Sequence, residues 1–265
     1  MTEKEYRNHP YVSRSELWKI RESPEKFKWH KENPSESTPA LIFGQFIHAM
    51  ILTPDEVWEQ FVLAPDVDRR TKEGKKAYAE FIENVGEKTP ISLEMAADAV
   101  NMSEAIKKND LARKLLSGQP EVPLFWVDEM TNEGCKCRLD SFLKKGDKLI
   151  VIDYKTTENA ETEAFMKSAM QYGYDFQAAM YSEGVKANYH VDPIFVFVAQ
   201  EKKPPYAINI LQTDELALRR GYDLFREFLG IYHECKETDN WYGYMGPENV
   251  INKLGIPAWL SKEFE

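Results

Sequence analysis

The spacing of apolar and polar residues divides the chain into a helical first part and a strand-rich second part. Up to residue 118 apolar side chains recur at helical intervals, which predicts helices starting near Ser13, Ser23, Pro39, Pro54, Lys75, Ser92 and Asp110. Residues 1–11 form a polar arm and 32–39 a loop in this prediction. From residue 119 onward, short runs of β-branched and aromatic residues indicate strands.

The second part alternates strands and helices. Strands are predicted at residues 121–130, 135–144, 148–156, within 190–200 and at 206–211. Helices are predicted at 158–172 and 174–187, and a long amphipathic helix follows a cap at Thr213. This order predicts an α/β domain with a central mixed sheet flanked by helices and an N-terminal helical elaboration. We expect one domain over 1–265, with the elaboration at 1–118, the core at 119–236 and a tail at 237–265.

One predicted hairpin carries polar residues in an otherwise apolar setting. Its turn contains Gly146, which suits a positive φ. Asp153 and Lys155 are two apart on the second strand and therefore share a face, while Asp140 lies on the partner strand. Two carboxylates and an ammonium group can thus meet at one place on the sheet.

This group of side chains favours a metal site. Two neighbouring carboxylates repel each other unless a cation lies between them, and carboxylate oxygen suits Mg²⁺ or Mn²⁺. Lys155 would orient a water molecule or balance charge on a phosphate. The alternative is an ordinary amphipathic hairpin with acids in water. We favour that alternative for Asp140 or Lys155 alone, and the metal site for Asp140, Asp153 and Lys155 together.

The motif around the hairpin resembles a known family. RLD, twelve residues and then DYK form the PD-(D/E)XK nuclease signature. The context resembles the RecE (exonuclease VIII) branch of phage and prophage exonucleases over about Val12 to Gln212. The matching segments are GQFIHAMILTPDEVWEQF, EVPLFWVDE followed by GCKCRLD, IDYKTTENA and YGYDFQAAMYSEGV. The upstream GxxxH and downstream QxxxY motifs make the resemblance more specific, and it implies a restriction-endonuclease-like core.

The resemblance also implies further site residues. His48 of GxxxH would join Asp140 and Asp153 as a metal ligand, although a lone histidine on an apolar helix is more often a core residue. Glu121 would be an additional acid of the site, with a solvated strand-end acid as an equal alternative. Gln177 and Tyr181 of QxxxY would hold DNA phosphate or the catalytic lysine; without the resemblance, Tyr181 is a core residue.

Composition sets limits on these predictions. The net charge is −10, which is unusual for a nucleic-acid enzyme, and the clearest basic run is RRTKEGKK at 69–76. An oligomeric channel that encloses DNA needs a basic lining but not a basic exterior. Three cysteines argue against a disulfide framework. The absence of a long apolar run or a signal-like N-terminus predicts a cytoplasmic protein without membrane contact.

These observations together predict an Mg²⁺-dependent exonuclease. The resemblance implies double-stranded DNA ends as substrate, 5′-to-3′ digestion, a 3′ single-stranded product, a homo-oligomeric ring and a RecT-type annealing partner. Two alternatives remain open. One is a RecB-like or CRISPR-adaptation nuclease that lacks an iron–sulfur cluster. Such a cluster needs four cysteine ligands, and this chain has three cysteines. The other is a catalytically silent DNA-binding module on the same fold, which intact Asp140, Asp153 and Lys155 oppose.

Overall fold

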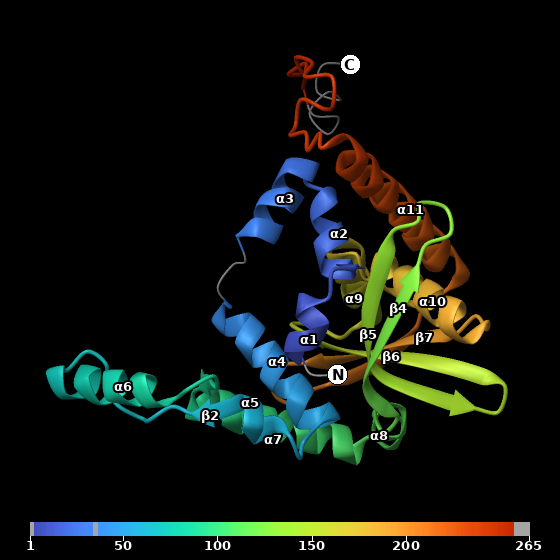
Figure 1. Cartoon of the computed structure of the whole chain (residues 1–265). Helices are drawn as coiled ribbons and strands as arrows, with labels where there is room; N and C mark the ends of the chain where they lie inside the picture. Colours follow the sequence, from blue (N-terminus) through green and yellow to red (C-terminus); the bar gives the residue numbers. More distant parts are fainter. Residues whose placement is uncertain (1–2, 34–36, 257–265) are drawn as a thin grey trace.

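A six-stranded mixed sheet lies at the centre of the structure, with helices on both faces (Figure 1). This computed structural model describes residues 3–33 and 37–256. The strands of the sheet are β1 (Val12–Ser13), β4 (Gln119–Val127), β5 (Gly134–Lys145), β6 (Lys148–Thr157), β7 (Ile194–Glu201) and β8 (Ile208–Gln212). A separate parallel pair is formed by β2 (Phe61–Leu63) and β3 (Thr89–Ile91).

Eleven helices are present in the described residues. They are α1 (Glu3–Asn8), α2 (Arg14–Ile20), α3 (Pro24–Glu32), α4 (Pro39–Leu52), α5 (Val57–Gln60), α6 (Lys72–Asn84), α7 (Leu93–Lys108), α8 (Asp110–Leu116), α9 (Thr162–Tyr172), α10 (Tyr174–Tyr189) and α11 (Glu215–Thr238). Local signals set several of their starts. Ser23, which precedes Pro24 at the start of α3, accepts a hydrogen bond from the Lys26 N–H. Asn109 caps α8 in the same way.

Strand β5 organises the sheet because it has neighbours on both edges. Antiparallel β4 pairs along one edge. The other edge is shared: parallel β1 pairs at Cys135–Lys136, and antiparallel β6 pairs from Ser141 onward. Among the described residues no strand pairs with this second edge between Lys136 and Ser141. The sheet therefore opens at one point along β5, and Asp140 lies there.

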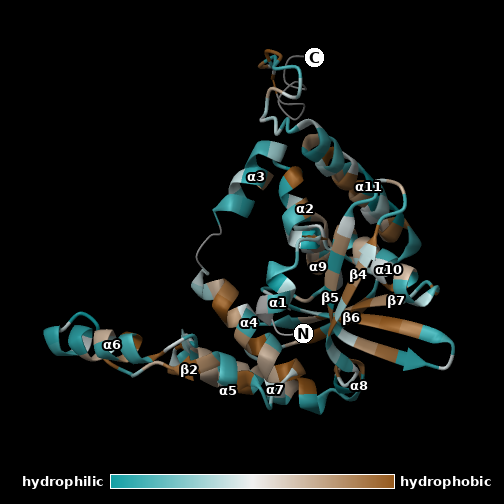
Figure 2. Cartoon of the chain, viewed as in Figure 1, coloured by the Kyte–Doolittle hydropathy of each residue, from teal (hydrophilic) through white to brown (hydrophobic). Residues whose placement is uncertain are grey.

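Two hydrophobic cores occupy the two faces of the sheet. On one face, α2, α9, α10 and α11 pack on β4, β5 and β7 through residues such as Leu17, Phe176 and Phe225. On the other face, α4, α7 and α8 cover Ile152 and Tyr154 of β6. Apolar colour follows the strands and the inner sides of the helices (Figure 2). Alternate residues of β6 thus face different cores, as a strand requires.

Most predicted elements are present, with shifted ends. The hairpin prediction is confirmed, since β5 and β6 pair from Ser141↔Ile152 to Lys145↔Lys148. The strand predicted at 121–130 begins and ends earlier in the structure: β4 covers Gln119–Val127, and Asp128 begins the turn. The helix expected at 158–172 starts only at Thr162, after a Glu161 cap. The long helix is capped by Asp214, whose carboxylate accepts from Ala217 N, and not by Thr213.

Two predictions near the N-terminal part were wrong. The polar arm contains helix α1. The carbonyls of Tyr6 and Arg7 in its last turn, and of His9 just after it, accept hydrogen bonds from the buried Lys136 ammonium. Of the helix predicted from Pro54, only Val57–Gln60 is helical. The next residues, Phe61–Leu63, form β2, which pairs with Thr89–Ile91 of β3. Both contacts join segments far apart in sequence, and local periodicity cannot reveal them.

The structure describes the predicted tail only as far as residue 256, so residues 257–265 of that prediction lie outside the described residues. None of the helices in residues 3–33 and 37–256 has the length and apolar character needed to cross a membrane.

Candidate active site

The point where β5 and β6 part brings the sequence-predicted acids together. Ladder pairing ends at Ser141↔Ile152, and one step further the Tyr154 N–H donates to Asp140 Oδ2 at 2.8 Å. A carboxylate therefore takes the place of a backbone carbonyl in the ladder. This satisfies the Tyr154 amide and holds Asp140 next to Asp153, in accord with the shared face predicted from the hairpin.

Strand β4 is irregular at the same level. Its register with β5 is constant from Gln119↔Phe142 to Val127↔Gly134, but the expected Glu121↔Asp140 pair is missing. Glu121 has a φ of +50°, a left-handed conformation that is costly for a residue with a side chain. Such strain persists where the surrounding structure imposes it, and here it coincides with the cluster of acids.

Glu121 is held near that cluster by charge. Arg138 Nε lies 2.6 Å from Glu121 Oε2, across the two strands. Burial raises the pKa of Glu121 to about 7, and the carboxylates of Asp140 and Glu56 add to the rise. The Arg138 contact favours the charged form and opposes this rise. The prediction that Glu121 lies near Asp140 is thus supported by position, whereas its role in catalysis stays a prediction.

Asp153 is the most enclosed acid of the site. It is 1% exposed, accepts a hydrogen bond from Gln177 Nε2 at Oδ1, and has Lys155 Nζ 2.5 Å from Oδ2. Burial raises the pKa of Asp153 to about 6; Lys155 opposes the rise and Asp140 adds to it. The Oδ2 atom is buried and accepts no hydrogen bond of ordinary geometry despite the close ammonium group.

Lys155 remains charged in this setting. Its burial works to lower the pKa, but the carboxylates of Asp153 and Asp140 outweigh burial and raise it. The ammonium also lies 5.0 Å from the centre of the Tyr174 ring, a cation–π contact. Lys155 is therefore a fixed positive charge beside two acids, as the same-face argument predicted.

His48 reaches the site from α4. Its Nδ1 is 3.5 Å from Asp140 Oδ2, and its ring packs edge-on against Tyr154 at 5.1 Å. The side chain is 27% exposed, so it is not a fully enclosed core histidine. One turn earlier, nothing lies within 4 Å of a side chain that would replace Gly44's hydrogen. The face of α4 that presents His48 is therefore open next to Gly44.

The two QxxxY residues make different contacts. Gln177, from α10, hydrogen-bonds the Asp153 carboxylate rather than Lys155. Tyr181 packs against Phe195, and burial raises the pKa of its hydroxyl, with Asp153 and Asp140 among the lesser causes. Gln177 thus supports a site acid directly, whereas Tyr181 packs at the edge of the core beside Phe195. Their predicted contact with DNA phosphate stays a prediction.

The donor set is suitable for a divalent cation, although it is not assembled as a closed cage. In the described residues no three His, Cys, Asp or Glu side chains are gathered as metal ligands. The chemistry still fits, because two carboxylates share one corner, burial raises the pKa of one of them, and its Oδ2 accepts no ordinary hydrogen bond. A cation between Asp140 and Asp153 would relieve these strains. The three cysteines are free and buried, and they take no part.

Sequence reasoning missed three contributors. Tyr154 supplies the amide for Asp140 and the ring against His48, and it stands inside the DYK motif. Arg138 stands inside RLD and binds Glu121. Arg14 donates to the Gly173 carbonyl at 2.8 Å, and burial lowers its pKa while Asp153 opposes that effect. The motif letters marked the first two positions, but no pattern singled out Arg14.

Most of the chain matches a known protein family. Residues 13–253 match the family described as "PDDEXK-like domain of unknown function (DUF3799)". The chain belongs to this family. Membership of this PDDEXK-like family places the chain in the PD-(D/E)XK nuclease superfamily and confirms the predicted restriction-endonuclease-like fold class.

Solved structures agree on the fold. A crystal structure described as "Putative exonuclease" from Eubacterium rectale superposes with a TM-score of 0.66 at 16% identity, covering 97% of this chain and 96% of that chain. The structure of SSO0001 gives a TM-score of 0.33 at 15% identity over 71% of this chain and 85% of that one, which is too low to support an argument. No curated protein sequence matches the chain.

Proposed function

We propose that this member of the PDDEXK-like family is a metal-dependent exonuclease that degrades linear double-stranded DNA. The observation that carries the proposal is the convergence of Asp140, Asp153 and Lys155 where β5 and β6 part. A buried acid beside a second carboxylate and a largely enclosed ammonium group is costly for stability and has a clear use in phosphodiester hydrolysis. A DNA-binding module without catalysis would have no need of this arrangement.

The residues divide the chemistry between them. Asp140, Asp153 and His48 would hold Mg²⁺, for which Mn²⁺ could substitute, and the bound ion would polarise the scissile phosphate and acidify the attacking water. Lys155 orients that water or balances the charge that develops on the phosphate. Gln177 holds the Asp153 carboxylate, and the Tyr154 N–H holds Asp140. Hydrolysis joins the water oxygen to phosphorus and releases the sugar oxygen.

The resemblance to RecE-like exonucleases supports the finer assignment. We propose 5′-to-3′ digestion of double-stranded ends, a 3′ single-stranded product for recombination, a ring of identical chains and cooperation with a RecT-type annealing protein. An enclosed path would let an acidic protein hold DNA, because the net charge of −10 repels a free duplex. We further propose that residues 1–265 act as a single domain.

End-labelled substrates test this assignment. Linear duplexes labelled at the 5′ or the 3′ end are incubated with the protein and Mg²⁺, next to a circular duplex. The proposal expects early release of the 5′ label as a mononucleotide and no digestion of the circle. Earlier release of the 3′ label would show 3′-to-5′ digestion. Cutting of the circular duplex would show endonuclease activity.

A further inference from the structure

One segment leaves the body of the molecule and returns to it. We define the arm as residues 64–90, which connect β2 to β3 and contain α6; it projects to one side of the sheet (Figure 1). Within the arm only Gly74 is buried. A helix the length of α6, 13 residues, is marginal in water when no core supports it. The arm therefore gains little stability from burial against other parts of its own chain.

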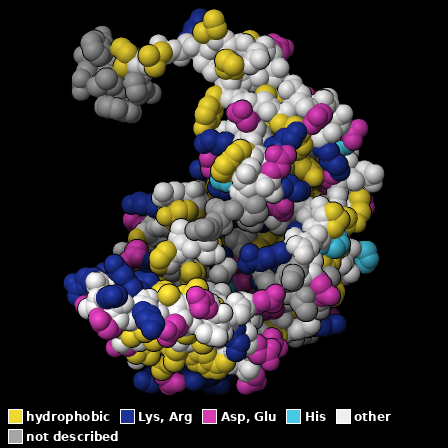
Figure 3. Space-filling view, turned by 60° about the vertical axis from the view of Figure 1, so that its left-hand side comes forward, with side chains coloured by type: hydrophobic (Ala, Val, Ile, Leu, Met, Phe, Trp, Pro, Cys, Tyr) yellow, Lys and Arg dark blue, Asp and Glu magenta, His cyan; other side chains and the backbone are white. Residues whose placement is uncertain are grey.

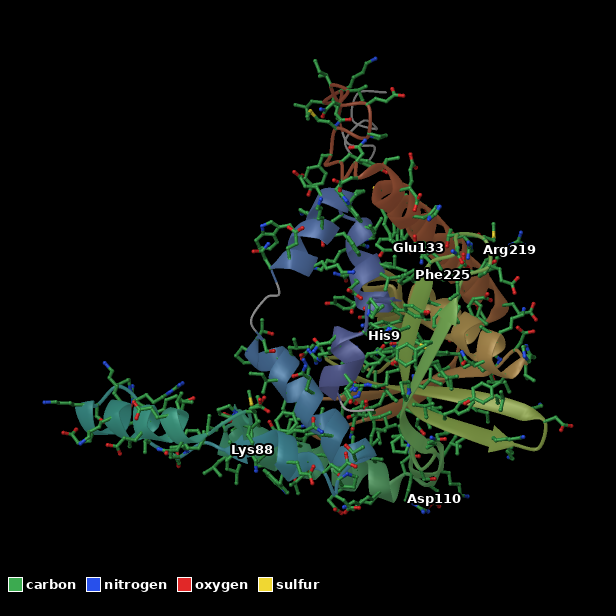
Figure 4. All side chains as sticks on the ribbon, viewed as in Figure 1. His9, Lys88, Asp110, Glu133, Arg219 and Phe225 are labelled. Atoms are coloured by element: carbon green, nitrogen blue, oxygen red, sulfur yellow. The ribbon has the colours of Figure 1, made fainter. Side chains whose placement is uncertain are left out.

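The arm nevertheless has a defined shape. At its root the Ala64 N–H donates to the Ile91 carbonyl at 2.8 Å, and Lys88 Nζ donates to the Trp58 carbonyl at 2.8 Å. Lys88 is labelled in Figure 4, between α6 and the body of the molecule. Thr71 caps α6. A Cβ on Gly74 would lie 2.1 Å from the Asp68 carbonyl oxygen, so the loop lies directly against the helix. This ordered extension without a core is typical of an element that packs on something else.

Apolar side chains at the arm and its root face outward. Ile82 is 42% exposed, Leu63 at the root 41%, and Trp58 just before the root 46%. Leu93, at the start of α7 directly after β3, is 50% exposed. In the space-filling view hydrophobic side chains form a band below the arm, next to Lys and Arg side chains gathered at its end (Figure 3). Exposed apolar side chains gathered in this way mark a protein contact.

Charge identifies the partner. Residues 69–76 hold five basic and one acidic side chain, a net charge of +4, in a chain with a net charge of −10. The rest of the chain carries −14, of which −4 lies on the remaining residues of the arm (64–68 and 77–90) and −10 on the body. Arg70 and Lys76 pair only with exposed Asp68 and Glu80, and such contacts contribute little to stability. The end of the arm is thus complementary to the body of the same protein.

We infer that the arm docks on a second copy of this chain. Its apolar side chains would be covered by the partner and its basic end would meet the acidic body, which also reduces the mutual repulsion of two acidic subunits. Double-stranded DNA would attract the basic end but would leave Ile82 and Leu63 in water. The inference gives the proposed oligomer a contact surface, and it does not depend on nuclease activity.

Association measured without DNA or metal tests the inference. The full chain is examined by light scattering and sedimentation over micromolar concentrations at low and high salt. The wild-type protein is expected to be larger than a monomer and to associate more weakly at high salt. Leu63→Gln with Ile82→Gln should weaken association by about tenfold or more. Leu111→Gln with Met166→Gln, which changes two still more exposed apolar side chains on α8 and α9, should leave it unchanged.

Charge reversal separates the two possible occupants. Lys72→Glu with Lys75→Glu changes only exposed side chains, so the fold is retained, and circular dichroism checks this. The inference expects weaker self-association in this variant. A monomeric wild-type protein, or arm variants that associate like it, would overturn the inference. So would a charge-reversed variant with unchanged mass and weaker duplex binding in EDTA, because DNA would then occupy the arm. A wild-type protein that associates as expected but digests no DNA would refute the proposed function and leave this inference standing.

Discussion

Single residues at the site influence one another through charge. Asp153 is buried between the Lys155 ammonium and the Gln177 amide, and its pKa rises to about 6 with burial as the main cause. Glu121, on the neighbouring strand, has a pKa of about 7, also chiefly because of burial. These acids keep protons that ordinary carboxylates lose, which is a usual property of catalytic groups.

Gln177 is the residue whose role the geometry defines most narrowly. Gln177→Ala should lower the rate of digestion by about 10- to 100-fold, because groups that orient a metal ligand typically contribute that much. Initial rates at saturating DNA and varied Mg²⁺ measure the effect. The matched control Gln212→Ala, at the exposed end of β8, should keep the wild-type rate. A Gln177→Ala enzyme as fast as wild type would remove this residue from the site.

Substitution of His48 tests whether this residue is a metal ligand or a core residue. His48→Ala should raise the Mg²⁺ concentration for half-maximal digestion by about tenfold or more, with little loss of folding stability, since the side chain is partly exposed. A metal titration of digestion and a urea unfolding curve are compared. An unfolded variant that keeps full activity per folded molecule would make His48 a packing residue.

The raised pKa values predict how pH and metal affect stability. Between about pH 4 and 7 the folded state keeps protons on Asp153 and Glu121 that the unfolded chain has lost, so the free energy of unfolding falls as the pH rises. If Mg²⁺ binds deprotonated Asp153, as we propose, it should raise the Tm more at about pH 8 than at about pH 5. Scanning calorimetry measures both shifts. Equal shifts at the two pH values would show that Mg²⁺ does not bind these acids.

At the scale of elements, β6 connects the site to the opposite core. The Tyr154 hydroxyl donates to Gln200 Oε1 at 2.6 Å, and Gln200 Nε2 donates to the Met102 carbonyl of α7 at 3.0 Å. One face of β6 thus carries Asp153 and Lys155 while the other is fixed to α7. The position of the face that carries Asp153 and Lys155 depends on hydrogen bonds made behind it.

Removing that anchor should cost stability. Tyr154→Phe leaves the Gln200 oxygen buried without a donor, which costs about 1–3 kcal/mol. Urea unfolding should show this loss, whereas Tyr189→Phe, which alters a tyrosine that is 42% exposed, should be near neutral. A Tyr154→Phe protein as stable as wild type would mean that water replaces the hydroxyl.

Sequence reasoning succeeded for elements that depend on local signals. The hairpin of β5 and β6, with Asp140, Asp153 and Lys155 on it, follows from strand periodicity and one glycine turn. It failed where distant segments meet. The β2–β3 pairing and the Lys136 contacts that hold α1 are invisible to any short window. The irregularity of β4 beside Asp140, with Glu121 at positive φ, likewise needs the folded sheet.

At the scale of the whole molecule, charge and shape favour assembly. The body is acidic, the arm ends in a basic group, and exposed apolar side chains lie at its root. A monomer would leave all three features unexplained. An assembly of copies would cover the arm, and the proposed ring would give DNA an enclosed route.

The central claim is that Asp140, Asp153 and Lys155 form one metal-dependent nuclease site, and a single comparison tests it most directly. Nucleotide release from a linear duplex is measured with Mg²⁺ or EDTA for wild type, Asp153→Asn and the exposed turn variant Asp147→Asn. We predict rapid release by wild type and Asp147→Asn with Mg²⁺, none in EDTA, and a loss of about 10³-fold or more in Asp153→Asn. Digestion by Asp153→Asn at the wild-type rate would contradict the account.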